Sequence, residues 1–109
     1  MRADEEVSVG VAGAESRAPV VLRPARDADI PAVLEIEQAA FGDPWSRSAF
    51  IDLLDDPRVA FLVADAGGAV QGYVVAWFVL DEGEIGNLAV SAEARRGGIG
   101  ARLLDGAIG

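Results

Sequence analysis

The chain has 109 residues, of which 51% are hydrophobic and 25% are charged, a composition that suits one folded domain and argues against a wholly disordered chain. Its formal net charge is −9, from 18 acidic and 9 basic residues, so no nucleic-acid partner is expected, whereas a cationic peptide or amine would be attracted. The absence of histidine and cysteine excludes a thiol nucleophile, a Ser-His-Asp relay, disulfides and the usual zinc sites.

The amino-terminal segment predicts no core structure. Residues 1–17 are small, acidic and aperiodic, so we expect a disordered tail followed by one domain over residues 18–109. The start of the chain is acidic where a secretory signal is basic, and no apolar signal core follows. The longest apolar run, 73–80, is far shorter than the roughly 20 residues of a membrane helix. These features predict a cytoplasmic protein with no membrane contact.

The first predicted elements are a strand and a helix. The β-branched run 19–23 predicts the strand. A helical pattern that Asp27 or Asp29 can cap follows it, and Gly42 ends this helix. Glu37 falls near the apolar stripe of the helix. The favoured interpretation is a carboxylate that reaches past the rim of the core to solvent, and the alternative is a role in a site.

A second helix and three strands follow. Ser46 is a suitable N-cap for the helix, which the Asp-Asp-Pro sequence at 55–57 ends. Three strand-like runs come next, Val59–Ala64, Val70–Leu80 and Ile85–Val90. Their short connections predict antiparallel neighbours, and the middle run has so little polar alternation that both of its faces should be covered. With a last helix after the third run, the order is β-α-α-β-β-β-α, which predicts an α+β fold.

A glycine-rich loop separates the last predicted strand from the last helix. Three glycines, Gly97, Gly98 and Gly100, allow several backbone amides to turn toward one point, where the helix dipole also favours an anion. Arg95 and Arg96 add charge suited to a phosphate or pyrophosphate. The chain has no lysine for a Walker loop, and the glycine spacing does not fit a dinucleotide fingerprint. The alternative is a plain glycine turn.

The loop pattern Arg95-x-x-Gly98-x-Gly100 resembles the pyrophosphate loop of the GCN5-related N-acetyltransferase (GNAT) superfamily, and the segment 87–90 looks like that family's fourth strand. The resemblance implies the N-terminal part of a mixed, mostly antiparallel GNAT sheet flanked by helices. It also implies acetyl-coenzyme A (acetyl-CoA) as co-substrate, with no metal. The implied cofactor-binding residues are Leu88, Ala89, Val90, Arg95, Arg96, Gly97, Gly98, Ile99, Gly100 and Ala101.

A narrower resemblance concerns the acceptor. The segments 36–38, 44–46 and 86–90, with Phe41 and Phe50, are similar to the RimI-like ribosomal-protein alanine N-acetyltransferases. This implies acetylation of a protein N-terminus, such as that of a ribosomal protein. The glutamate base and tyrosine acid of that family would lie beyond Gly109, so no catalytic residue is assigned. The chain is then expected to be incomplete, with an exposed sheet edge through which it could self-associate.

Three residues carry open alternatives. Trp45 either belongs to the core or lines an acceptor-peptide groove, and Glu84 is a candidate substrate contact, although a carboxylate at a hairpin end is usually only solvated. Tyr73 is a conceivable acid, but a tyrosine in a strand more often packs in the core. The competing functions are a small-amine acetyltransferase of the same superfamily and an inactive fragment that binds acetyl-CoA.

Overall fold

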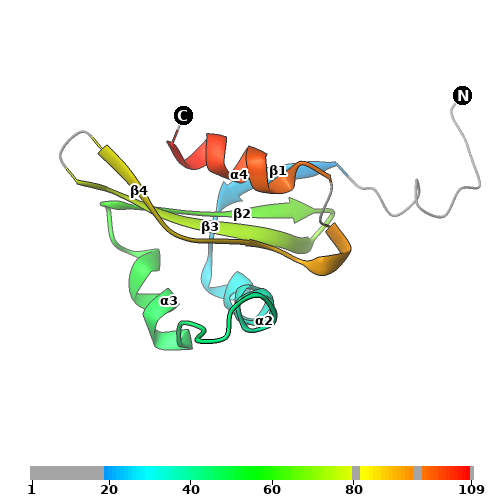
Figure 1. The fold of residues 1–109 in the computed structure, drawn as a ribbon, viewed down its shortest axis with the longest axis horizontal. Coiled ribbons are helices and arrows are strands. Elements are labelled where there is room, and N and C mark those ends of the chain that lie inside the picture. Colours follow the sequence, from blue (N-terminus) through cyan, green and yellow to red (C-terminus); the bar gives the residue numbers. More distant parts are fainter. Residues whose placement is uncertain (1–18, 80–81, 95–96, 109) are drawn as a thin grey trace, which may run out of the picture.

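One antiparallel sheet organises the chain. The computed structural model describes residues 19–79, 82–94 and 97–108, so the predicted tail at 1–17 lies outside the described residues. The sheet contains β1 (Val20–Pro24), β2 (Val59–Ala66), β3 (Ala69–Val79) and β4 (Glu82–Val90), in chain order (Figure 1). The predicted strands are therefore confirmed, with β2 and β4 longer than the runs 59–64 and 85–90, because the hairpin ladders continue toward their turns.

Helices cover both faces of the sheet. The short helix η1 (Asp27–Asp29) leads into α2 (Ile30–Ala40), and α2 and α3 (Arg47–Leu54) lie against one face (Figure 1). The short helix η2 (Ala92–Ala94) precedes α4 (Ile99–Ile108), which lies against the other face. This arrangement confirms the predicted α+β order. None of the described helices has the length and hydropathy needed to cross a bilayer.

The central strand β3 is covered on both sides. Tyr73 and Val75 point into the core with α2 and α3, and Val74 and Ala76 point into the core with α4. All four side chains are 0% exposed. Successive residues of a strand point to opposite faces, so an unbroken apolar run is the pattern of a strand buried twice. The prediction that this strand has both faces covered is confirmed.

The helix α3 begins where the sequence predicts. Ser46 has an extended backbone, and its Oγ accepts a hydrogen bond of 3.2 Å from the amide of Ala49. This bond satisfies one of the amides that the first helical turn leaves without a partner. The predicted N-cap is confirmed, and it fixes where the loop between α2 and α3 ends.

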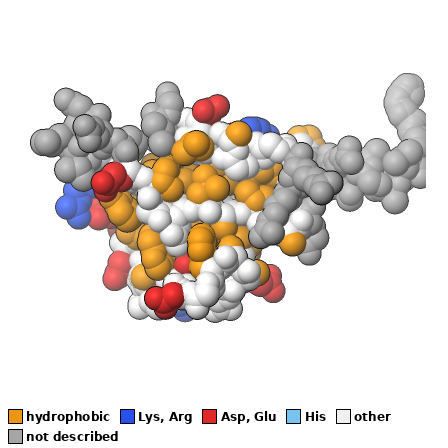
Figure 2. Space-filling model, viewed as in Figure 1, with side chains coloured by type: hydrophobic (Ala, Val, Ile, Leu, Met, Phe, Trp, Pro, Cys, Tyr) orange, Lys and Arg blue, Asp and Glu red, His pale blue; other side chains and the backbone are white. Residues whose placement is uncertain are grey.

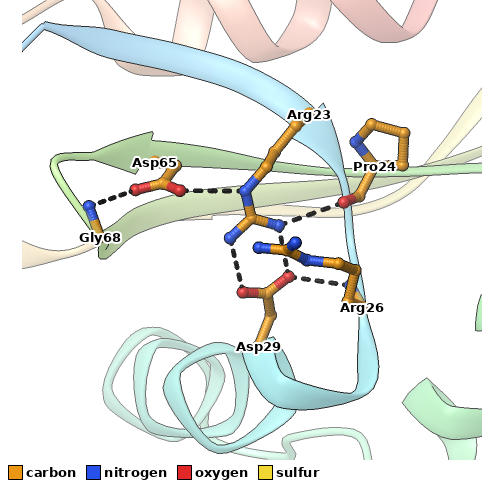
Figure 3. Close-up of polar contacts among 6 residues, drawn as sticks. All are labelled: Arg23, Pro24, Arg26, Asp29, Asp65 and Gly68. Carbon is orange, nitrogen blue, oxygen red and sulfur yellow. Dashed lines mark hydrogen bonds and ion pairs between the residues drawn. The ribbon is translucent and has the colours of Figure 1, made fainter.

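A half-buried cluster around Arg23 ties β1 to its neighbours (Figure 3). The Arg23 guanidinium donates to both carboxylate oxygens of Asp29 at 2.7 and 2.8 Å and, through Nε, to Asp65 at 3.0 Å. Asp29 also accepts from the amide of Arg26 at 2.8 Å, and Asp65 accepts from that of Gly68 at 2.7 Å. The hydrogen bond from Arg23 is the main cause that lowers the pKa of Asp29. The cluster joins β1, η1, β2 and the β2–β3 turn.

A hydrophobic surface lies along β4. Within the residues that the structure describes, β4 pairs with β3 alone and so forms an edge of the sheet. In the view of Figure 1, hydrophobic side chains gather on the side where β4 lies, between α4 and the pair of helices below the sheet (Figure 2). Ile85 of β4 is 37% exposed there. The edge strand therefore carries apolar side chains as well as backbone groups that face away from β3.

Candidate functional site

The glycine loop forms the amino-terminal end of α4. Gly98 has a φ of 77°, a left-handed conformation that favours glycine, and a Cβ on it would meet nothing within 4 Å. Its carbonyl accepts from the amide of Arg102 at 3.1 Å, which begins the helix. The first-turn amides of a helix have no partner inside the helix, and the dipole makes this end positive. The loop therefore has the backbone geometry of an anion site, while Arg95 and Arg96 lie outside the described residues.

The predicted cofactor strand lies against this loop. Leu88 and Val90 of β4 pack toward α4, and a Cβ on Gly100 would lie 3.8 Å from each of their side chains. Ala89 points to the opposite face, into the core with α2 and α3. The Ile99 side chain is buried, so Ile99 can face a ligand only through its backbone. Ala101 is exposed. The structure thus brings the described members of the predicted cofactor site together.

A bulge interrupts β4 at Gly86. Val75 pairs with Asn87 and Ala76 pairs with Ile85, which leaves Gly86 without an opposing residue on β3. Gly86 faces the Trp45 and Trp77 rings, and Asn87 contacts Glu37, so two consecutive residues point to the α2 and α3 face. A bulge has this effect, because the extra residue breaks the strand's alternation and redirects its backbone. A glycine inside a strand was the available signal for it.

The Glu37 carboxylate is the centre of a buried polar cluster. The side chain is 0% exposed, so the expectation that it reaches solvent is wrong. One oxygen accepts from the amide of Trp45 at 2.7 Å, the other accepts from the Tyr73 hydroxyl, and the Asn87 amide lies 2.9 Å from both. These donors compensate the burial of a charge, which would otherwise be strongly unfavourable. We refer to Glu37, Trp45, Tyr73 and Asn87 as the Glu37 cluster.

Tyr73 is buried in this cluster rather than exposed to a ligand. Its ring lies edge-on to Phe50, with centroids 5.6 Å apart, which confirms the interpretation of a core residue. Burial, followed by the hydrogen bond to Glu37, raises the pKa of Tyr73 well above its ordinary value. The hydroxyl therefore stays protonated across the physiological range and acts as a donor to Glu37.

Two tryptophans border the bulge. Trp45 is half-buried, packs against Phe50, and stacks on Trp77 with ring centroids 6.5 Å apart and planes inclined by 16°. The Trp77 indole nitrogen donates to Glu84 at 2.9 Å, and Glu84 is exposed. Trp45 thus belongs partly to the core, and Glu84 has a partner that sets its direction. Both predicted substrate residues lie on the α3 side of β4.

The strand β4 connects two regions of different chemistry. Its carboxyl end lies beside the glycine loop, which suits an anion, and the bulge lies beside the Glu37 cluster and the tryptophans, which suit an apolar and cationic group. In the described part of the chain, no group of three or more acidic residues could hold a metal ion. The arrangement can hold a phosphorylated ligand at one end of a strand and a second group near the middle of it.

Comparison with known proteins agrees with this arrangement. Residues 30–109 match the acetyltransferase (GNAT) family. The chain is 36% identical over 81 residues to a putative ribosomal protein bS18-alanine N-acetyltransferase of Bacillus subtilis (strain 168). The aligned segment covers 73% of this chain and 54% of that protein. The resemblance to the RimI-like ribosomal-protein alanine N-acetyltransferases is therefore confirmed.

Solved structures give the same result. The crystal structure of the ribosomal-protein-S18-alanine N-acetyltransferase from Escherichia coli superposes with a TM-score of 0.71 at 28% identity, over 81% of this chain and 56% of that one. N-acetylglutamate synthase from Neisseria gonorrhoeae, solved with coenzyme A and N-acetyl-glutamate, superposes with a TM-score of 0.64 at 28% identity, over 82% of this chain and 22% of that one.

The chain spans about half the length of the curated relatives it matches. The matched part includes α2, the bulge of β4, the glycine loop and α4, which are the elements that form both regions of the site. On the strength of this match, the chain belongs to the acetyltransferase (GNAT) family.

Proposed function

We propose that this chain supplies the acetyl-CoA site and part of the acceptor site of a protein N-terminal acetyltransferase. The observation that carries the proposal is the contact between the glycine loop and β4, where Gly100 lies against Leu88 and Val90. This contact puts the anion site of α4 in line with a strand at the edge of the described sheet, whose backbone has one side facing away from β3. An extended ligand with a phosphate at one end fits such a surface.

The residues present fit coenzyme A on chemical grounds. Gly98 has a left-handed backbone conformation, in which any other residue would be strained although a Cβ would meet nothing within 4 Å. The amides of Ile99, Gly100 and Ala101 at the start of α4, with Arg95 and Arg96, would hold the pyrophosphate. The backbone of β4 at Leu88 and Ala89 would pair with the pantetheine arm, in the manner of an added strand.

The co-substrate supplies an acetyl thioester when it is bound. In the transfer, the acceptor nitrogen bonds to the acetyl carbon, the carbon–sulfur bond breaks, the amine loses a proton, and the thiolate gains one. A backbone amide of β4 near the bulge would polarise the thioester carbonyl. We assign no base or acid to the chain, because Tyr73 is buried and Glu84 is exposed and accepts a hydrogen bond from the Trp77 indole.

The acceptor we propose is a protein α-amino group with basic residues behind it. The net charge of −9 favours a cationic peptide, and Trp45, Trp77 and Glu84 offer aromatic faces and a carboxylate beside the bulge. Relatives named for the alanine of ribosomal protein bS18 make an alanine-initiated ribosomal peptide the first acceptor to test. The expected location is the cytoplasm.

Calorimetric titration with acetyl-CoA tests the proposal, with release of coenzyme A followed in the presence of an alanine-initiated basic peptide. The matched control is the same peptide with its N-terminus already acetylated. Pantetheine, which lacks the pyrophosphate, should bind much more weakly than acetyl-CoA. Binding with peptide-dependent release supports the whole proposal, and binding without release supports the cofactor site alone. Equal affinity for acetyl-CoA and pantetheine, or no binding, would contradict the loop assignment.

A further inference from the structure

The Glu37 cluster joins α2 to three other parts of the chain. The carboxylate is on α2, and its donors come from the loop between α2 and α3 (Trp45), from β3 (Tyr73) and from β4 (Asn87). Trp45 and Tyr73 donate to different oxygens of the carboxylate, and the Asn87 amide lies near both. A change in the position of one donor therefore changes the geometry available to the others.

Two of the donors, Trp45 and Asn87, hold two different backbone segments near Gly86. The amide of Trp45 is backbone, so its bond to Glu37 at 2.7 Å fixes the path of the loop rather than only a side chain. Asn87 follows the bulge residue Gly86 directly, so its two contacts of 2.9 Å fix the strand where its alternation breaks. The Trp45 and Trp77 rings close over Gly86 between these points.

Core packing alone does not require a carboxylate at this position. An apolar side chain of similar size would fill the space on α2, but it would leave the Trp45 amide, the Asn87 amide and the Tyr73 hydroxyl without their common acceptor. Among the described residues, the hydrogen-bond partners of the Glu37 carboxyl group are these three donors, and its side chain is 0% exposed. Glu37 cannot touch an acceptor itself, so any effect on it passes through Trp45 and Asn87.

From this geometry we infer that Glu37 is a positioning residue. It holds the loop between α2 and α3 at Trp45 in register with the bulge of β4, and it so sets the place of the acceptor amine. The inference rests on the proposed function. The glycine loop and α4 lie on the opposite face of the sheet from α2. Loss of the carboxylate should therefore affect the acceptor and leave acetyl-CoA binding nearly unchanged.

The test compares Glu37→Gln with Glu35→Gln in the full 109-residue chain. Glu35 is exposed on the same helix, so its substitution makes the same change in charge without touching the cluster. In Glu37→Gln, an NH₂ donor replaces one acceptor oxygen and faces other donors. We measure the dissociation constants of acetyl-CoA by calorimetry and of the alanine-initiated basic peptide, at saturating acetyl-CoA, by the fluorescence of Trp45 and Trp77, the two tryptophans of the chain.

The expected result for Glu37→Gln is peptide binding weakened about tenfold or more with the affinity for acetyl-CoA within about twofold, since one buried donor loses its partner. Glu35→Gln should match the wild-type chain in both. The double variant Glu37→Gln/Asn87→Asp exchanges the amide and the carboxylate across the same contact, and it should recover part of the lost peptide affinity. Recovery identifies the contact, because a general loss of stability would not respond to this exchange.

If Glu37→Gln does not fold, Tyr73→Phe provides the same comparison, since it removes one donor and keeps the ring in the core. Equal weakening of both ligands, or of neither, would overturn the inference. Failure of the wild-type chain to bind the peptide at saturating acetyl-CoA would also overturn it. Failure of the wild-type chain to bind acetyl-CoA would instead contradict the proposed function, so the two failures are distinguishable.

Discussion

Gly86 lies so close beneath the Trp77 indole that a Cβ on it would be 2.5 Å from Cζ3 of that ring. The same Cβ would be 3.0 Å from Cη2 of Trp45. The first distance is too short for a real carbon contact and the second is unusually tight, and the rings belong to a packed cluster that resists displacement. Glycine at the bulge is thus required by the two tryptophans, which face each other across it.

Gly86→Ala should lower the free energy of unfolding by about 1–3 kcal/mol, because the indoles must move or the strand must shift. Urea denaturation followed by tryptophan fluorescence measures this change. The control is Gly42→Ala, since a Cβ on Gly42 would meet nothing within 4 Å. The double variant Gly86→Ala/Trp77→Val should be more stable than the sum of the two single effects predicts, and strict additivity would mean that the contact is not the cause.

Gly98 and Gly100 of the loop should respond to substitution in opposite ways. Gly98→Ala forces a left-handed conformation on alanine and should destabilise the chain by about 1–2 kcal/mol. Gly100→Ala lies inside α4 with ordinary contacts of 3.8 Å, so the better helix propensity of alanine should stabilise the chain by up to about 1 kcal/mol.

The affinity for acetyl-CoA distinguishes an effect on ligand binding from an effect on stability in the variants of Gly98 and Gly100. If the backbone of Gly100 contacts the co-substrate, Gly100→Ala should be as stable as the wild-type chain or more so, yet bind acetyl-CoA more weakly by calorimetry. A stable Gly100→Ala chain with unchanged affinity would remove Gly100 from the cofactor site. The Gly98→Asn variant, whose side chain tolerates the left-handed region, should retain more stability than Gly98→Ala.

The Arg23 cluster should make stability depend on pH in the acid range. The pKa of Asp29 is lowered in the folded chain, so its contribution is complete above the ordinary carboxyl pKa of about 3.9 and is lost as the pH falls below it. Asp29→Asn should therefore lower the free energy of unfolding by about 1.5–3 kcal/mol at neutral pH. It should also flatten the decline in stability between about pH 5 and pH 2.

Urea denaturation at a series of pH values measures both effects. The exposed Asp52 on α3 provides the control, because Asp52→Asn removes the same charge away from the cluster. If Asp29→Asn and wild-type curves run parallel below pH 5, the ion pair with Arg23 does not contribute the expected pH dependence.

The N-cap of α3 should depend on a hydrogen-bond acceptor at position 46 rather than on the size of the side chain there. Ser46→Ala removes the acceptor for the Ala49 amide and should cost about 1 kcal/mol of stability. Ser46→Asp keeps an acceptor at the positive end of the helix and should match the wild-type chain. Thermal unfolding followed by circular dichroism compares the three proteins, and equal midpoints for serine and alanine would contradict the cap.

Local chemistry made most of the fold predictable. The cap at Ser46, the apolar run of β3 and the glycines before α4 each act within a few residues of their own position, so sequence periodicity and turn chemistry identify them. The anion loop was predictable for the same reason, since its donors come from consecutive backbone groups. The bounds of β1 and β3 shift by one residue, and β2 and β4 are longer than predicted, because ladder pairing continues beyond the apolar runs.

The acceptor side of the site was not predictable in this way. The partners of Glu37 lie 8, 36 and 50 residues away, and only the folded sheet brings them together. A glutamate on the edge of an apolar stripe usually reaches solvent, and this one is buried because each distant partner is a donor. The bulge at Gly86 likewise depends on pairing with β3, so the glycine inside the strand was a signal for a bulge but could not fix the register by itself.

The chain order of the strands has a consequence for folding. The strands β2, β3 and β4 pair as consecutive hairpins, so each pairing closes only a short turn and loses little chain entropy. The strand β1 pairs with β2 across the whole α2 and α3 segment, as in the pairing of Pro24 with Leu62. We expect the three-stranded meander to form first and β1 to join last, when Arg23 meets Asp29 and Asp65 and closes the one long excursion among the described strands.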